Sequence, residues 1–192
     1  MLKLKHMAYK NKFKIAVAGA AEEHVCSKTA TKLAEEVGKE IVRQGCIVVT
    51  GATTGMPHYA AIGAKKAKGL SIGFSPAATE IAHVKKYRLP YDAFDVIVYT
   101  GFGYAGRNLL MTRAADGVII ICGRMGTLNE FTIAFEDEKP IGVMSGSGGI
   151  ADELNQIVKR PFRGRMNMIY STEPKELVKQ LIKLIKKEKG RL

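Results

Sequence analysis

The chain has 192 residues and a formal net charge of +12, with 46% hydrophobic residues, 25% charged residues and 20 glycines. This composition excludes disordered, fibrous and membrane-embedded proteins, and the length favours one domain with a substantial core. No stretch approaches the roughly 18 apolar residues that span a bilayer, and the N-terminus lacks the apolar centre of a secretion signal. We therefore expect a cytoplasmic protein that does not enter a membrane.

The positive charge is concentrated at the two ends of the chain. Residues 1–14 contain five lysines and no acidic residue, and residues 173–192 contain seven basic and three acidic residues. Basic ends on a nearly balanced core are more often solvated tails than a nucleic-acid groove, although they attract phosphate-bearing partners. We predict a basic tail over residues 1–12 and an amphipathic helix over residues 173–190, and we hold nucleic-acid binding as a minority hypothesis.

The cysteines and histidines do not indicate a metal site. The cysteines, Cys26, Cys46 and Cys122, are far apart in sequence and lie in or beside apolar segments. This placement predicts buried free thiols and fits a reducing compartment. The histidines, at positions 6, 24, 58 and 83, have neither metal-ligand spacing nor cysteine partners at zinc-site distances. We expect no bound metal.

Apolar and helical segments alternate along the chain. Seven apolar runs predict strands at residues 13–19, 46–51, 70–76, 94–101, 118–122, 140–146 and 166–170. Helices are predicted at residues 27–45, 56–69, 104–117, 126–139, 151–161 and 173–190, with a loop or flap at residues 77–92. Buried strands that alternate with amphipathic helices indicate a parallel sheet covered on both faces. The predicted fold is a single α/β domain over residues 1–192.

Glycine-rich turns follow four of the predicted strands, at residues 18–23, 50–56, 99–107 and 122–130. In an open parallel sheet these turns share the carboxyl edge, where ligands bind. Glycine lets the backbone approach a ligand, and a helix N-terminus adds partial positive charge, so the turns suit phosphate. They predict a nucleotide or sugar-phosphate pocket, against the alternative of plain strand-to-helix turns. None is a P-loop, and none reads G-x-G-x-x-G with an acidic residue at the end of the next strand, as a dinucleotide-binding motif does.

Two charged residues stand out in these turns. Glu130 should lie near the end of the first turn of its helix, where the helix dipole stabilises a carboxylate, and this alone could explain it. Arg107 lies near the start of the preceding helix, where a cation opposes the dipole. A residue placed against its local preference indicates either a function or a tertiary salt bridge.

The stretch "GRNLLMTRAADGVIIICGRMGTLNE" resembles the core of the LOG family, Rossmann-like proteins often labelled lysine decarboxylases. The family pattern is P-G-G-x-G-T-x-x-E with an arginine fifteen residues before the proline, and Arg107 precedes Cys122 by the same interval. Cys122 replaces the proline and Arg124 replaces the second glycine. The segments "IAVAGA" and "VTGATTGMPHYAAIGAKKAKGLSIGFSP" also resemble the family, so the likeness covers about residues 13–145. The remaining motif positions match: Gly123, Gly126, Thr127 and Glu130.

The resemblance implies a Rossmann-like three-layer sandwich with a mostly parallel sheet of about seven strands. It also implies hydrolysis of the N-glycosidic bond of a purine nucleoside 5′-monophosphate, giving free base and ribose 5-phosphate. Arg107 and Glu130 would be catalytic, with Glu130 stabilising an oxocarbenium-like transition state and orienting water. No metal or organic cofactor would be required. The phosphate or nucleotide would contact Gly19, Ala20, Gly51, Thr54, Gly55, Met56, Asn108, Gly123, Arg124, Met125, Gly126 and Thr127.

The departures from the motif leave a second function open. Arg124 adds bulk near the phosphate, although its guanidinium could bind phosphate itself, and Asn108 stands where plant-type members have lysine. Either change could leave a non-catalytic carrier of a nucleotide or of a molybdopterin-type phosphorylated cofactor, because this prokaryotic branch also resembles molybdenum-cofactor carrier proteins. A third hypothesis is single-stranded nucleic-acid binding, since the DNA-processing protein A family shares a related fold and the chain is basic.

Two further expectations concern partners and chemistry. The small-residue helix at 56–69 and the narrow apolar stripe of the C-terminal helix suggest subunit contacts, and LOG-like proteins form dimers, so we predict a homo-oligomer. Lysine decarboxylation finds no support, because nothing in the sequence marks a lysine that would carry pyridoxal phosphate.

Overall fold

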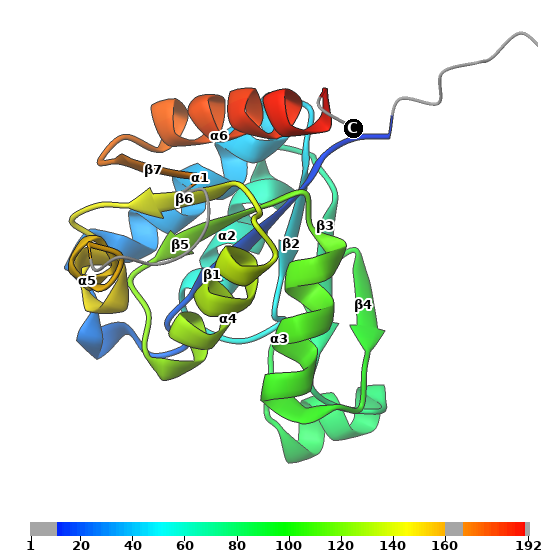
Figure 1. Cartoon of the computed structure of the whole chain (residues 1–192). Coiled ribbons are helices and arrows are strands. Elements are labelled where there is room, and N and C mark those ends of the chain that lie inside the picture. Colours follow the sequence, from blue (N-terminus) through cyan, green and yellow to red (C-terminus); the bar gives the residue numbers. More distant parts are fainter. Residues whose placement is uncertain (1–10, 160–166, 191–192) are drawn as a thin grey trace, which may run out of the picture.

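Seven parallel strands form a single sheet in the computed structural model, which describes residues 11–159 and 167–190 (Figure 1). The strand order is β4-β3-β2-β1-β5-β6-β7, so the chain builds outward from β1 to one edge and then returns to the other side of β1. This doubly wound order places a topological switch point between β1 and β5. The strands are β1 Lys14–Gly19, β2 Ile47–Thr50, β3 Ser71–Ser75, β4 Val96–Tyr99, β5 Gly117–Ile121, β6 Ile141–Met144 and β7 Met168–Ser171.

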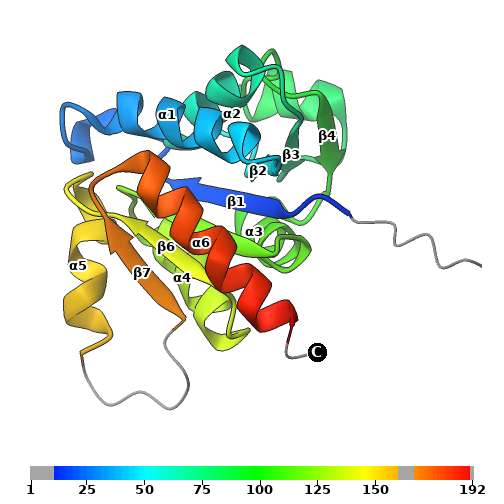
Figure 2. The same ribbon diagram turned by 90° about the horizontal axis from the view of Figure 1, so that it is seen from above.

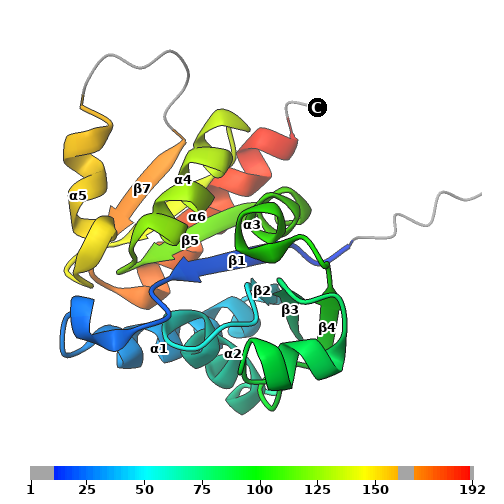
Figure 3. The same ribbon diagram turned by 90° about the horizontal axis from the view of Figure 1, so that it is seen from below.

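Helices cover both faces of the sheet and complete the three layers. One face carries α1, α2 and α6 (Figure 2), and the other carries α3, α4 and α5 (Figure 3). The predicted Rossmann-like three-layer sandwich is therefore confirmed, although most elements are a few residues shorter than predicted. The helices are α1 Ala30–Arg43, α2 Met56–Lys66, α3 Gly103–Ala114, α4 Met125–Glu136, α5 Gly149–Ile157 and α6 Pro174–Lys189, with short helical turns at Glu23–Val25 and Ala82–Lys86.

The alternation of side chains along the central strands divides the core in two. In β1, Ile15 and Val17 face the layer of α1, α2 and α6, whereas Ala16 and Ala18 face the layer of α3, α4 and α5. Every residue of β5 is buried because β5 lies between β1 and β6 and is covered on both faces. The near-continuous apolar runs of the sequence arise from this double burial.

The two features that suggested subunit contacts are used within the chain. Ala60 and Gly63 of α2 are buried, and a side chain on Gly63 would clash with the backbone of Glu35 in α1. The apolar stripe of α6 is buried against the sheet and α1. Neither feature therefore supports a homo-oligomer, which stays a prediction that needs other support.

The segment predicted as a loop or flap is anchored at one histidine. His83 lies in the short helical turn Ala82–Lys86 and is fully buried. Its ring nitrogens lie 2.8 Å from Ser75 Oγ and 2.9 Å from the carbonyl oxygen of Pro90. Both polar atoms of the ring thus have partners, which is the usual condition for a buried histidine in a structural role.

The expectation of three free thiols is wrong for two of the cysteines. Cys26 and Cys122 form a disulfide with their Cα atoms 5.5 Å apart, although 96 residues separate them in sequence, while Cys46 is free and buried. They meet because they follow β1 and β5, which are hydrogen-bonded neighbours in the sheet. The cysteines therefore give no support to the prediction of a reducing compartment, which rested on three free thiols.

Within residues 11–159 and 167–190, no helix is long and apolar enough to cross a membrane. Over the same ranges, no cluster of three or more histidine, cysteine, aspartate or glutamate side chains could hold a metal ion. The first ten residues of the predicted basic tail lie outside the described residues.

The close crossing of α1 and α2 gives a stability prediction. A methyl group at Gly38 would clash with the backbone of Ala60, so Gly38→Ala should lower the free energy of unfolding by about 1–3 kcal/mol. The loss should occur although alanine favours an isolated helix by roughly 1 kcal/mol. Urea unfolding followed by circular dichroism would measure it, with Lys32→Ala on the exposed side of α1 as the control. An unchanged or raised midpoint for Gly38→Ala would contradict the packing.

Candidate functional site

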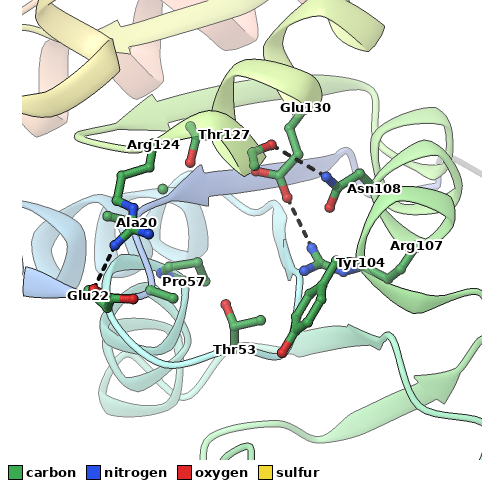
Figure 4. A pocket seen from close by; sticks show the side chains of 13 residues that line it. Ala20, Glu22, Thr53, Pro57, Tyr104, Arg107, Asn108, Arg124, Thr127 and Glu130 are labelled. Carbon is green, nitrogen blue, oxygen red and sulfur yellow. Dashed lines mark hydrogen bonds and ion pairs between the residues drawn. The ribbon is translucent and has the colours of Figure 1, made fainter. Parts of the chain in front are cut away.

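A cavity of about 190 Å³ lies at the carboxyl edge of the sheet, where the turns after β1, β2 and β5 meet the start of α3 (Figure 4). This is the switch point at which doubly wound sheets bind ligands. The volume is below the roughly 300–1,000 Å³ of sites for drug-sized ligands, so the cavity matches a fragment such as a sugar phosphate in size. The lining residues are Gly19, Ala20, Ala21, Glu22, Thr53, Pro57, Tyr104, Arg107, Asn108, Arg124, Gly126, Thr127 and Glu130.

A buried ion pair forms one wall of the cavity. Arg107, on the second turn of α3, donates from Nη1 to Oε1 of Glu130, on the second turn of α4, at 3.0 Å. The two residues are only 4% and 6% exposed, and both line the cavity. The tertiary salt bridge explains why Arg107 tolerates its unfavourable position near the start of a helix.

Burial changes the proton affinity of both partners. It raises the pKa of the Glu130 carboxyl to about 7, and the nearby Arg107 guanidinium opposes this shift. Burial also lowers the pKa of Arg107, against the pull of Glu130. Glu130 can therefore exchange a proton near neutral pH, which an ordinary glutamate cannot do.

Arg107 fits because its neighbours leave room for it. The guanidinium lies directly against the backbone of Gly51, where any side chain would collide with it. Its Cζ lies 5.9 Å from the centroid of the Tyr104 ring, within the range of a cation–π contact. The Nε atom of Arg107 is buried without a hydrogen-bond partner in the described part of the chain. The residue thus carries an unsatisfied buried donor, as well as lining the cavity.

The N-terminus of α4 faces the same cavity. Arg124 is its N-cap, and no side chain caps the helix. The first N–H groups, from Met125 to Thr127, have no acceptor within the helix and carry its positive dipole end. At Gly126, which lines the cavity, an added Cβ would meet open space. The Asn108 amide, 2.9 Å from Asn129 Oδ1 and 3.4 Å from the Gly126 carbonyl oxygen, fixes this turn to α3.

A second arginine–glutamate pair closes the opposite end of the cavity. Arg124 donates from Nη1 to Oε2 of Glu22 at 2.6 Å, which links the N-cap of α4 to the turn after β1. Figure 4 shows this pair on one side of the cavity and the Arg107–Glu130 pair on the other. Unlike the buried pair, the side chains of Arg124 and Glu22 are 51% and 57% exposed.

The backbone at Cys122 accounts for one departure from the LOG motif. Cys122 has φ 55°, and its N–H donates to Ser147 Oγ at 2.7 Å. Proline has φ near −65° and no N–H, so it could not adopt this conformation or make this bond. Gly123, with φ 109°, continues the turn and lies against the Thr127 side chain. The loop before α4 therefore follows a path here that a proline at position 122 would prevent.

Eight of the fourteen residues predicted for the site line the cavity, and six do not. Met56 is fully buried, with its N–H bonded to the Ala20 carbonyl oxygen at 2.9 Å. Thr54 Oγ1 donates to the Ala21 carbonyl oxygen at 3.0 Å, and Gly55 lies against the same turn. Gly51 and Gly123 act through their backbones, as described above, and the Met125 side chain is 75% exposed. These six residues shape the cavity or border it without lining it.

Five lining residues were not predicted: Ala21, Glu22, Thr53, Pro57 and Tyr104. Ala21 and Glu22 lie in the predicted glycine-rich turn 18–23, and Thr53 lies in the predicted turn 50–56. The sequence therefore predicted which turns line the cavity, but not which of their residues do so. Tyr104 belongs to the turn 99–107, where its proximity to Arg107 was a usable signal. Which side chain of a turn faces inward depends on tertiary packing and leaves no periodic pattern in the sequence.

Known proteins resemble this chain over most of its length. Its sequence is 28% identical over 127 residues to an uncharacterized protein of Archaeoglobus fulgidus, covering 66% of this chain and 76% of that protein. The molybdenum cofactor binding protein of the phototrophic bacterium Rippkaea orientalis is 30% identical, with a TM-score of 0.73 over 92% of this chain and 98% of that one. DNA processing protein A of Streptococcus pneumoniae shares the fold alone, at 20% identity and a TM-score of 0.67 over 88% of this chain and 62% of that one.

The predicted likeness to LOG-type and molybdenum-cofactor carrier proteins is confirmed by these comparisons together with the family match. The sequence matches the SLOG cluster4 family over residues 12–178, from the first strand into the last helix. This chain is a member of the SLOG cluster4 family.

Proposed function

We propose that the protein binds a nucleoside 5′-monophosphate at the switch-point cavity and hydrolyses its N-glycosidic bond. The observation that carries this proposal is the Glu130 carboxyl, which is buried in the cavity wall one turn from an uncapped helix N-terminus. The helix terminus suits the 5′-phosphate, and the carboxyl then lies on the side where the sugar would extend. A nucleoside monophosphate joins these two groups in one small molecule.

The chemistry requires a carboxylate beside the anomeric carbon. As the bond between C1′ and the base nitrogen breaks, its electron pair leaves with the base and C1′ becomes positively charged. Glu130 in its ionised form stabilises that charge and accepts a proton from the attacking water, whose oxygen bonds to C1′. Glu130 returns the proton it took from the water to the departing base, directly or through solvent, so the carboxylate is restored and the products are the free base and ribose 5-phosphate. No group outside the chain, the substrate and water is needed.

Arg107 has two roles in this proposal. Its positive charge opposes the effect of burial on Glu130, and so keeps an ionised fraction of the carboxylate available at neutral pH. Its hydrogen bond to Oε1 also fixes the carboxylate orientation, which leaves Oε2 for the sugar or the water. A positioned carboxylate loses less entropy on reaching the transition state than a mobile one.

A carrier function is the second candidate, and a specific finding favours it. The protein of known structure at 30% identity is a molybdenum cofactor binding protein, and the chain spans 98% of it. The phosphate of such a cofactor could use the same helix terminus, with no bond being cleaved.

Single-stranded nucleic-acid binding stays a minority hypothesis, because the resemblance to DNA processing protein A is confined to the fold. The salt dependence of oligonucleotide binding would test it.

Glu130→Gln should lower the rate of base release from AMP by about 10²–10⁴-fold, because the amide accepts no proton and carries no charge. Chromatography of the released base would measure it, with Glu136→Gln at the exposed end of the same helix as the control. Equal rates for Glu130→Gln and the unmodified protein would refute the hydrolase. Absence of release from any nucleoside monophosphate, together with a phosphorylated pterin retained through purification, would favour the carrier.

The rate should depend on pH through the ionisation of Glu130. Since the proposed base must be deprotonated and its pKa is about 7, kcat/KM for AMP should rise between pH 5.5 and 8 and then level off. Arg107→Gln removes the charge that lowers this pKa, so the midpoint of its residual activity should move to higher pH. A rate that falls through neutral pH would assign Glu130 the role of an acid, and would overturn the role proposed here.

We further propose that the protein is a homo-oligomer, with support from exposed apolar side chains that gather on β4 and α3. These are Val96 and Val98 of β4, Phe102 at the N-cap of α3, and Leu109 and Leu110 of α3. Surfaces of this kind are typical of protein interfaces.

Light scattering should give a mass that is a multiple of the chain mass, and Leu110→Glu should shift it toward the monomer. Leu70→Glu, at a residue of similar exposure before β3, is the matched control. A monomeric mass for the unmodified protein would exclude this arrangement.

A further inference from the structure

The cavity is bounded by two arginine–glutamate pairs that differ in how easily they open. Arg107 and Glu130 are buried together, and separating them would leave a charge unpaired in a region of low dielectric constant. Arg124 and Glu22 make an equally direct contact, but about half of each side chain is exposed. Exposed ion pairs contribute little to stability because water competes for both charges. The second pair can therefore open without disturbing the fold.

Arg124 stands directly at the site that suits an anion. It precedes the first free N–H groups of α4, and it lines the cavity together with Gly126. In the structure its guanidinium is paired with the carboxylate of Glu22, which comes from the turn after β1 at the same end of the cavity. Glu22 thus supplies the negative charge that a bound phosphate would otherwise bring to Arg124.

We propose that the Arg124–Glu22 pair is a charge-selective gate on the cavity, an inference that rests on the proposed nucleotide site. When the cavity is empty, Glu22 holds Arg124. A phosphate monoester displaces Glu22, because its dianion and three acceptor oxygens bind a guanidinium more strongly than one carboxylate does. A neutral nucleoside cannot displace Glu22 and gains nothing from Arg124. The gate therefore selects phosphate monoesters, and Glu22 lowers their affinity through its competition.

The gate predicts different effects of its two members on binding. Glu22→Gln should tighten AMP binding by about 2–5-fold, as expected for release of an exposed ion pair. Arg124→Ala should weaken AMP binding by at least about tenfold. Neither change should alter the affinity for adenosine, which has no phosphate. Isothermal titration calorimetry of AMP and of adenosine would measure these effects without requiring turnover.

Two comparisons separate the gate from general repulsion by acidic residues. Glu23→Gln removes the same charge from the next residue, which bonds to Tyr59 rather than to Arg124, and it should leave AMP affinity unchanged. Glu22 Oε2 also lies 3.4 Å from His24 Nδ1, but the gate acts through Arg124. In the double variant Glu22→Gln/Arg124→Ala, the gain from Glu22→Gln should therefore disappear. An equal gain from Glu22→Gln with and without Arg124, or no gain at all, would overturn the gate.

These results also separate the gate from the proposed activity. Base release from AMP with no effect of Glu22→Gln on binding would reject the gate and leave the hydrolase intact. AMP binding that follows the predicted pattern without any base release would reject the hydrolase and support the gate. Failure of the unmodified protein to bind AMP would reject both.

Discussion

The ion pair between Arg107 and Glu130 is the contact on which the candidate site depends. It joins α3, which links the two halves of the doubly wound sheet, to α4, which follows the first strand of the second half, β5. Burying two charges costs much of what their attraction returns, so such a pair contributes little net stability compared with apolar side chains of similar volume. We interpret its position beside a cavity as a sign of function, because apolar side chains of similar volume would stabilise the fold at least as well.

The surrounding turns are arranged to make this pair possible. Gly51, at the end of β2, provides the space that the guanidinium fills. Thr54 and Met56 then hold the turn after β1 in place through its carbonyl oxygens, and Asn108 fixes the start of α4. Several residues of the glycine-rich turns therefore do not line the cavity themselves. Gly51 leaves room for the Arg107 side chain, and Thr54 and Met56 hold the turn after β1 in position through hydrogen bonds.

The sequence was sufficient to predict the fold and to single out Arg107 and Glu130, whose catalytic role stays a prediction. Apolar runs located all seven strands because each is buried or paired in a parallel sheet, and the interval from Arg107 to Glu130 identified two side chains that do meet. The disulfide escaped prediction because Cys26 and Cys122 become neighbours only when β1 pairs with β5. Thr53 and Tyr104 escaped because the direction of a side chain in a turn is set by packing between elements, which no local pattern records.

The disulfide between Cys26 and Cys122 also changes the covalent topology of the molecule. It closes the chain from Cys26 to Cys122 into a ring that contains β2, β3, β4 and β5 and the helices α1, α2 and α3, so parts of both helical layers. A single break in the backbone within that ring would leave both fragments attached to one another. The segment that contains β2, β3 and β4 is thus joined at its two ends by the disulfide. This lowers the conformational entropy of the unfolded chain relative to a chain without the bond.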